Sequence, residues 1–159
     1  MTDLLIAAGV FILLITISIG TWDIYKIRLA SRIEYDQMSM RGYHAIESLV
    51  RTPGYPENWE DLAATNLDAV RMFGLADADH LINHEKLIAL MSIQDTAKLK
   101  DILNIGPYSF LLRLKKPGPT EQIIYSFGSK PTNEKAAVSL SRVVVYNDDV
   151  HLMEMIVYR

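Results

Sequence analysis

The sequence predicts an α+β fold: a long N-terminal helix, apolar at first and then amphipathic, packed on a C-terminal antiparallel β-sheet of about four strands with two short helices. Three observations support this prediction. An apolar run without charged residues extends from Leu4 to Trp22. Apolar residues then recur every three or four positions as far as Pro53, and every second position after Tyr108. These are the periods of a helix face and of a half-buried strand.

The apolar run is long enough to cross a membrane. A helix rises about 1.5 Å per residue, so residues 4–22 would span about 28 Å, close to the roughly 30 Å hydrocarbon core of a bilayer. A cleaved secretory signal would have basic residues before the run and a small-residue cleavage site after it. Here Asp3 precedes the run, Thr21 and Trp22 end it, and Asp23 follows it. We therefore expect residues 1–22 to be a retained transmembrane helix or the core of a helical assembly.

Residues 23–52 are predicted to continue the same helix with one apolar face. The face consists of residues spaced by three or four: Ile24, Ile27, Ser31, Tyr35, Met38, Gly42, Ala45 and Leu49. Charged residues fill the other faces, and no proline interrupts the pattern before Pro53. We expect this half of the helix to cover the apolar face of the sheet, because a sheet with one apolar face needs a second layer.

Residues 53–159 are predicted to form a globular head domain. Its first residues, Pro53, Gly54 and Pro56, favour a tight turn at the junction with the long helix. The aromatic residues that follow or flank this turn, Tyr55 and Trp59, are expected to pack one ring on the core, because large aromatic side chains carry much of a small core's buried area.

The middle of this domain is predicted to hold one short strand and two short helices. The strand is expected at residues 70–75, followed by a polar loop containing Asp77, Asp79 and His80. Asn83 and Asp95 each precede a run of helical periodicity and are expected to cap the two helices.

The C-terminal half reads as four strands. The expected ranges are residues 108–115, 121–127, 137–146 and 150–158, separated by turns rich in glycine, proline, asparagine and aspartate. Because each strand follows its neighbour closely, we expect an antiparallel sheet.

Composition excludes several classes of function. The net charge is −3 and there is no cysteine, so neither a nucleic-acid partner nor a thiolate metal site is predicted. His80 and His84 stand four apart, but the expected cap at Asn83 lies between them and removes their common helix face. No phosphate-binding loop or nucleophile motif is present. We expect no cofactor, no metal, no catalytic residue and no enzymatic activity.

Charge next to the apolar run bears on orientation. Lys26, Arg28 and Arg32 follow the run, and only Asp3 precedes it. Taken alone, the positive-inside rule places the C-terminal domain in the cytoplasm. A basic leader before Met1 would reverse the balance, so the alternatives are an internal and an external domain.

The junction between the long helix and the domain resembles a known pattern. Residues 49–60 read Leu-Val-Arg-Thr-Pro-Gly-Tyr-Pro-Glu-Asn-Trp-Glu. This stretch is similar to the L-V-x-[ST]-P-G-x-P-x-x-W junction of archaeal type IV pilin-like proteins with a class III signal peptide. Further similarity lies in four short stretches: residues 73–76, 85–87, 98–105 and 141–146.

The resemblance implies a structural subunit of an archaeal type IV pilus-like surface filament. In such proteins a basic leader is removed, and the apolar helices of many subunits pack together in the filament. The implied partners are copies of itself or other pilins, membrane lipid before assembly, and the pilus assembly machinery. An acid near the mature N-terminus usually neutralises the amine of a neighbouring subunit. Asp3 matches that acid, although it stands third and without a leader before it.

Four residues in the apolar run or directly before it are predicted to act in assembly: Asp3, Gly9, Phe11 and Gly20. Glycines allow helices to approach closely in membranes. A different class of function remains open beside the filament subunit, namely a single-pass membrane-anchored protein whose C-terminal domain binds a partner.

Overall fold

A computed structural model describes residues 2–118, 120–132 and 136–159 of the chain. The chain forms two compact units, Met1–Asp36 and Gln37–Arg159. We call them the N-terminal unit and the head unit. The predicted boundaries followed composition and were placed after residues 22 and 52, whereas the division in the structure lies between Asp36 and Gln37.

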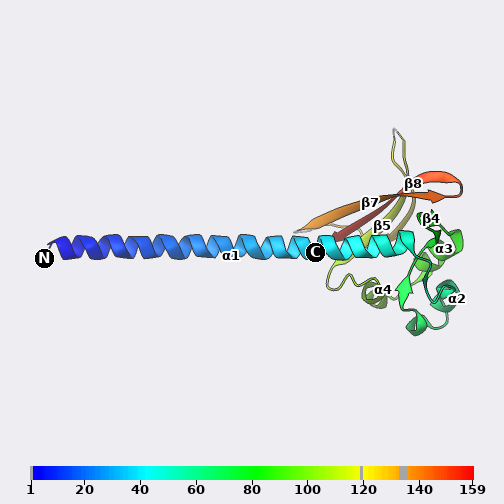
Figure 1. Ribbon diagram of the computed structural model, residues 1–159, viewed down its shortest axis with the longest axis horizontal. Coiled ribbons are helices and arrows are strands. Elements are labelled where there is room, and N and C mark those ends of the chain that lie inside the picture. The colour runs from blue at the N-terminus through cyan, green and yellow to red at the C-terminus, as the bar shows by residue number, and fades with distance from the viewer. Residues whose placement is uncertain (1, 119, 133–135) are drawn as a thin grey trace. The chain divides into compact units, whose positions relative to one another are not determined.

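The predicted long helix is present as α1 (Thr2–Arg51), which has 50 residues. It ends just before Thr52 and Pro53, where the proline disfavours helical geometry in the preceding residue. The hydroxyl of Thr52 donates to the Ser48 carbonyl at 2.8 Å, which satisfies one of the last helical acceptors. Figure 1 shows α1 together with the strands and short helices of the head unit.

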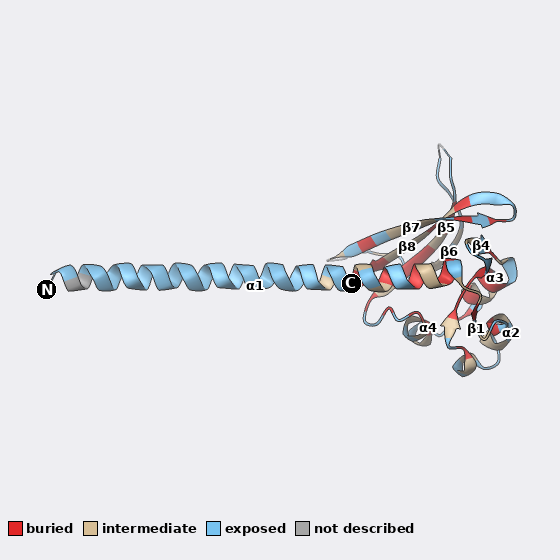
Figure 2. Cartoon of the chain, viewed as in Figure 1, coloured by how far each residue is buried: buried red, intermediate tan, exposed pale blue. Residues whose placement is uncertain are grey.

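In the head unit, one face of α1 packs on the sheet. Its buried residues follow helical spacing: Met38, Gly42, Ala45, Ile46, Leu49 and Val50. The predicted face began earlier, and that part of the prediction is wrong. Ile24, Ile27 and Tyr35 are 54%, 68% and 50% exposed. Figure 2 shows buried residues only in the C-terminal part of α1. Periodicity therefore indicated the apolar face of the helix correctly, but not the residue at which the sheet begins to bury it.

Six strands form the main sheet, in the order β3-β4-β7-β8-β5-β6. Their bounds are β3 (Ala76–Ala78), β4 (Leu81–Ile82), β5 (Ser109–Lys116), β6 (Gln122–Gly128), β7 (Ala137–Tyr146) and β8 (Asp149–Tyr158). The pairs are antiparallel except for β4 with β7. The four predicted strands are confirmed. The polar loop that was expected to contain Asp77, Asp79 and His80 is partly wrong, because Asp77 lies in β3. The sequence did not indicate β3 and β4, since strands of two or three residues are too short to show a period of two.

A second, two-stranded sheet joins β1 (Gly54–Tyr55) to β2 (Met72–Phe73). The strand expected at residues 70–75 is thus shorter than predicted. Two short elements between these strands were not predicted: α2 (Trp59–Ala63) and the 3-10 helix η1 (Leu67–Ala69).

The two predicted short helices are α3 (His84–Ser92) and α4 (Thr96–Ile102). Both expected caps are confirmed: the Asn83 side chain accepts from the Lys86 amide, and the Asp95 side chain accepts from the Lys98 amide. Each cap satisfies a backbone donor that the first helical turn leaves unpaired.

A single core connects these elements. The inner face of the sheet contributes Met153, Met155 and Val157 from β8, all fully buried. Gly42 lets α1 approach this face, since a Cβ there would lie 2.8 Å from Leu140 Cδ1 and 2.9 Å from Val157 Cγ2. The opposite side of α1 contacts the β2 segment and the end of α4, where the Ser48 hydroxyl donates to the Phe73 carbonyl and Arg41 donates to the Asn104 carbonyl.

The burial difference between two methionines of α1 gives a direct test of where helix packing begins. Met38 is fully buried and Met40 is 63% exposed. Met38→Ala is expected to lower the free energy of unfolding of the head unit by about 2–5 kcal/mol, because it leaves a cavity. Met40→Ala is the matched control and should change it by less than about 0.5 kcal/mol. Urea unfolding of the full chain in detergent, followed by the fluorescence of buried Trp59, measures both; equal effects would contradict the packing.

Candidate functional site

The N-terminal unit presents apolar side chains all around a helix. Large apolar residues from Ile6 to Tyr35 are exposed, among them Phe11 at 64% and Trp22 at 58%. Such a surface is costly in water, since each buried apolar Å² is worth about 25 cal/mol. By length and composition α1 qualifies as a membrane-spanning helix, with a mean hydropathy of 1.8 in its most apolar window. The unit therefore needs lipid or other protein around it.

All four predicted assembly residues are exposed on this surface. A Cβ added at Gly9 or Gly20 would meet nothing within 4 Å. These glycines are eleven residues apart, which is close to three full turns and places them on one face of the helix. Phe11 lies on the opposite face, and Asp3 is an exposed carboxylate in the first turn. The four residues thus do not form one patch on a single helix, although a partner on each side could use them.

The threonine hydroxyls in the apolar run, those of Thr16 and Thr21, are satisfied within the helix. Thr16 donates to the Ile12 carbonyl at 2.9 Å, and Thr21 donates to the carbonyls of Ile17 and Ser18. Because these groups already have partners, they can lie in lipid without an unpaired donor.

The predicted junction residues form a tight structural unit. Trp59 is fully buried, as expected for one ring of this stretch, whereas Tyr55 is 64% exposed. The Trp59 indole donates to the Gly74 carbonyl at 2.8 Å and meets the Phe73 ring edge-on. Gly54 has a φ of +88°, and a Cβ there would lie 2.5 Å from the indole.

Pro53 and Pro56 complete the junction. The bond before Pro56 is cis, and the Pro53 carbonyl accepts from the buried Lys86 ammonium at 2.9 Å. The backbones also come close, since a Cβ on Gly74 would overlap the Thr52 carbonyl. These contacts give the residues that carry the family resemblance a role in joining the end of α1 to β1, β2 and α3.

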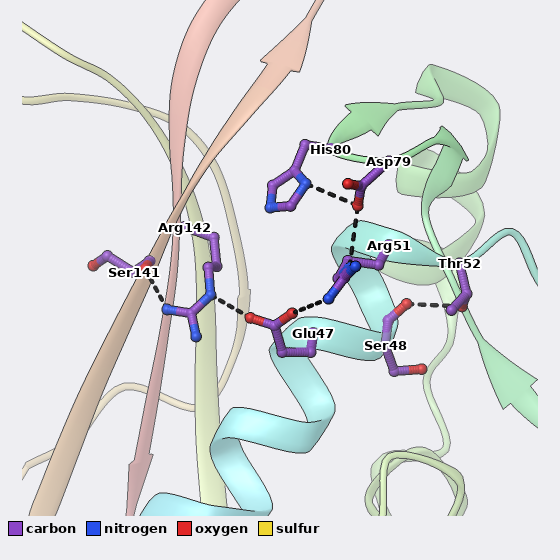
Figure 3. Close-up of polar contacts among 8 residues, drawn as sticks. All are labelled: Glu47, Ser48, Arg51, Thr52, Asp79, His80, Ser141 and Arg142. Carbon is purple, nitrogen blue, oxygen red and sulfur yellow. Dashed lines mark hydrogen bonds and ion pairs between the residues drawn. The ribbon is translucent and has the colours of Figure 1, made fainter.

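A chain of charged groups links α1 to the sheet at the same end (Figure 3). Glu47 on α1 accepts from Arg142 Nε of β7 at 2.5 Å and lies 3.6 Å from Arg51. Arg51 contacts Asp79 at 3.2 Å, and Asp79 contacts His80 at 2.9 Å in the turn between β3 and β4. The Glu47 carboxylate raises the pKa of Arg142.

The two halves of this chain differ in burial. The side chains of Glu47 and Arg142 are 19% and 25% exposed, and those of Arg51 and Asp79 are 57% and 63% exposed. Arg142 also lies over the Tyr43 ring, 5.0 Å from its centroid. The Glu47–Arg142 pair therefore holds α1 in register with β7. The outer pair, Arg51–Asp79, adds little to stability because it is exposed to solvent.

A hydrogen-bonded aromatic chain lies between α3 and the sheet. His84 Nδ1 is 2.6 Å from the Tyr146 hydroxyl, which donates to the Tyr125 hydroxyl at 3.2 Å. His151 meets the Tyr146 ring edge-on. Burial of Tyr146 is the main cause that raises the pKa of its hydroxyl to about 12.

This arrangement separates the two histidines that the sequence placed four apart. His80 faces Asp79 in a turn, and His84 faces Tyr146 at the start of α3. Within the described residues, no group of three or more His, Cys, Asp or Glu side chains is arranged to hold a metal ion.

Neither polar chain was predicted from the sequence. Glu47 and Arg51 are four residues apart, a spacing that indicates an ion pair on one helix. Arg142 and Tyr146 come from β7, far along the chain, and no local pattern connects them to Glu47 or His84. Only the fold brings these partners together.

Comparison with known protein families, characterised proteins and solved structures finds no match to this chain. The architecture nevertheless corresponds to the one that the junction residues suggested. It has a long exposed apolar N-terminal helix and a C-terminal sheet on which the end of that helix packs. The chain has a pilin-like architecture.

The two ion pairs should differ in strength in double-mutant cycles. We expect a coupling energy of about 1–2 kcal/mol for Glu47→Ala with Arg142→Ala, because both groups are largely shielded from solvent. The exposed pair, tested by Arg51→Ala with Asp79→Ala, should give less than about 0.5 kcal/mol. Urea unfolding of the six variants and wild type measures both couplings, and a stronger outer pair would overturn the assignment.

The buried Tyr146 hydroxyl should ionise late in an alkaline titration. Its pKa in the folded state is about 12, against an ordinary value of 10.0. The unfolded chain releases this proton first, so the stability from the neutral hydroxyl is complete below pH 10 and is lost as pH rises towards 12. The tyrosinate absorbance of wild type minus Tyr146→Phe should rise near pH 12. In denaturant the same difference should move to near pH 10; an unmoved curve would contradict the burial.

Proposed function

We propose that this chain is a structural, non-catalytic subunit of an archaeal type IV pilus-like surface filament and assembles through α1. The observation that carries the proposal is the uncovered apolar surface of the N-terminal unit. Its described side chains from Ile6 to Ile33 are exposed throughout. Lipid would cover this surface before assembly, and copies of the same helix would cover it afterwards.

The end of the apolar run has the features of a membrane interface. Trp22 and Tyr25 stack with their centroids 6.0 Å apart, and Lys26 Nζ lies 5.6 Å from the Trp22 ring centroid. Aromatic rings and lysines are enriched where a helix leaves the hydrocarbon region. This placement supports a stage in which residues 4–22 span a bilayer, as pilin-like subunits do before assembly.

Asp3 has a defined role in the proposal. A carboxylate buried among apolar helices is stable only with a partner charge. The terminal amine of a neighbouring subunit would supply that charge in an assembly, and water at the membrane surface would solvate the carboxylate in a single helix. In the proposal, Asp3 is thus solvated before assembly and paired with the amine after it.

A single-pass anchored protein whose head binds a partner is the second candidate. The exposed cluster of Lys26, Arg28 and Arg32 favours it, because these residues resist translocation and would hold the head in the cytoplasm. Protease treatment of intact cells separates the candidates. Digestion of the head supports a surface subunit, and protection supports the cytoplasmic anchor.

The test of the filament proposal removes residues 1–22. The truncated chain should stay in the aqueous phase as a monomer, because its most apolar surface is gone, whereas the full chain should enter detergent and form filaments when detergent is withdrawn. Light scattering and electron microscopy measure these outcomes. Filaments built by the truncated chain would refute the proposal.

A second arm of the same experiment uses the full chain with Asp3→Ala. It should lower the yield of filaments and leave the membrane-bound fraction unchanged, since the carboxylate acts only between subunits. Thr2→Ala is the matched control. An unchanged yield with Asp3→Ala would remove the pairing role of Asp3 without affecting the role of the apolar surface.

A further inference from the structure

The two edges of the main sheet differ in a way that bears on binding. The β3 edge has three residues and contains Asp77. Short length and charge both protect an edge from another strand. The β6 edge has seven residues, Gln-Ile-Ile-Tyr-Ser-Phe-Gly, with no charge and no proline. Ile123 and Ile124 on it are 49% and 36% exposed.

The pairing register identifies which backbone groups of β6 face outward. The Ser129 amide donates to the Phe110 carbonyl of β5 at 3.0 Å, and the pairs that follow are Gly128 with Leu111 and Phe127 with Leu112. Hydrogen-bonded and non-hydrogen-bonded pairs alternate along an antiparallel ladder. Gly128 and Ser126 therefore direct their N–H and C=O groups away from β5, towards the open edge.

A groove runs beside these outward groups. Its volume is about 550 Å³, and it lies between the end of β6 and the segment that joins α3 to α4. Its apolar walls include Ile93, Phe110 and Phe127. Ser126 and Gly128 of β6 also line it. This volume is within the usual range for ligand pockets, about 300–1,000 Å³.

Among the described residues that line the groove, Lys100 carries the one charge. Its Nζ contacts the Ser109 hydroxyl at 3.3 Å, a neutral partner. A carboxylate brought into the groove would give this ammonium an opposite charge at short range.

We propose that the β6 edge and this groove bind an extended peptide by strand addition. The peptide pairs its main chain with Ser126 and Gly128, directs alternate apolar side chains into the groove and offers a carboxylate to Lys100. Strand addition draws affinity from main-chain hydrogen bonds and specificity from pockets for alternate side chains.

The groove also selects against one obvious occupant, the β6 strand of a second copy. The inward side chains of that strand, Tyr125 and Phe127, already pack on their own core, so they are not free to fill a groove in another molecule. An extended segment with unengaged side chains fits, and the site is therefore independent of filament assembly through α1.

The test uses the full chain in detergent and a fluorescent hexapeptide of alternating valine and threonine that ends in a free glutamate. Saturable binding is expected, measured by fluorescence anisotropy. Ser126→Pro should weaken it at least about fivefold, because proline removes the outward N–H without removing a ladder bond to β5. Ser126→Ala keeps the N–H and is the matched control. Lys100→Met should abolish the preference for the acidic peptide over its C-terminal amide, glutamine-ended form.

A probe variant keeps the test valid if Ser126→Pro disturbs the strand. The same peptide with alternate backbone nitrogens methylated retains its side chains but cannot pair with an edge, so it should fail to bind the wild-type chain. Equal binding of methylated and unmethylated peptides would overturn strand addition. Absence of saturable binding up to about 1 mM, the scale of a weak complex, would overturn the site itself.

Discussion

Burial of one face of α1 against β7 and β8 is the contact on which the head unit depends. The sheet has a continuous apolar inner face, and one face of α1 covers it with buried side chains, namely Met38, Ala45, Ile46, Leu49 and Val50. Gly42 is what permits the close approach, because its missing side chain leaves space for Leu140 and Val157. The Glu47–Arg142 pair then fixes the helix along its axis and about it. Without this helix segment, neither the sheet nor the small helices would have a complete core.

Much of this arrangement is accessible from local sequence patterns. The long helix, its end before Pro53, the caps at Asn83 and Asp95, and the four longer strands each follow from periodicity or from a residue with a strong positional preference. The short strands β3 and β4 are not accessible in this way, because two or three residues carry no period. The start of helix burial is inaccessible for another reason. Ile24, Ile27 and Tyr35 continue the same apolar spacing as Met38, and only the extent of the sheet decides which of them is covered.

The candidate sites show the same division between local and distant information. The exposed apolar surface of α1 could be predicted, since nineteen uncharged positions in a row cannot be hidden by a domain of this size. The Glu47–Arg142 pair, the Tyr146 hydroxyl chain and the groove beside β6 all join residues that are distant in sequence. Each requires knowledge of which strands are neighbours. The junction stretch is intermediate: its residues suggested an architecture, and the structure explains them as the support for Trp59 beneath Gly74.

The position of β8 has a consequence for how the chain is made. It is the last strand along the chain, yet it lies in the middle of the sheet and pairs with both β5 and β7. The β5–β6 hairpin and the β3–β4–β7 group therefore have no common neighbour until β8 has been synthesised. Ribosomes add about 5–20 residues per second, so α1 is complete several seconds before the head can close. During that interval the apolar helix can reach a membrane while the rest of the chain is still unfolded, and insertion would precede folding as a matter of order of synthesis.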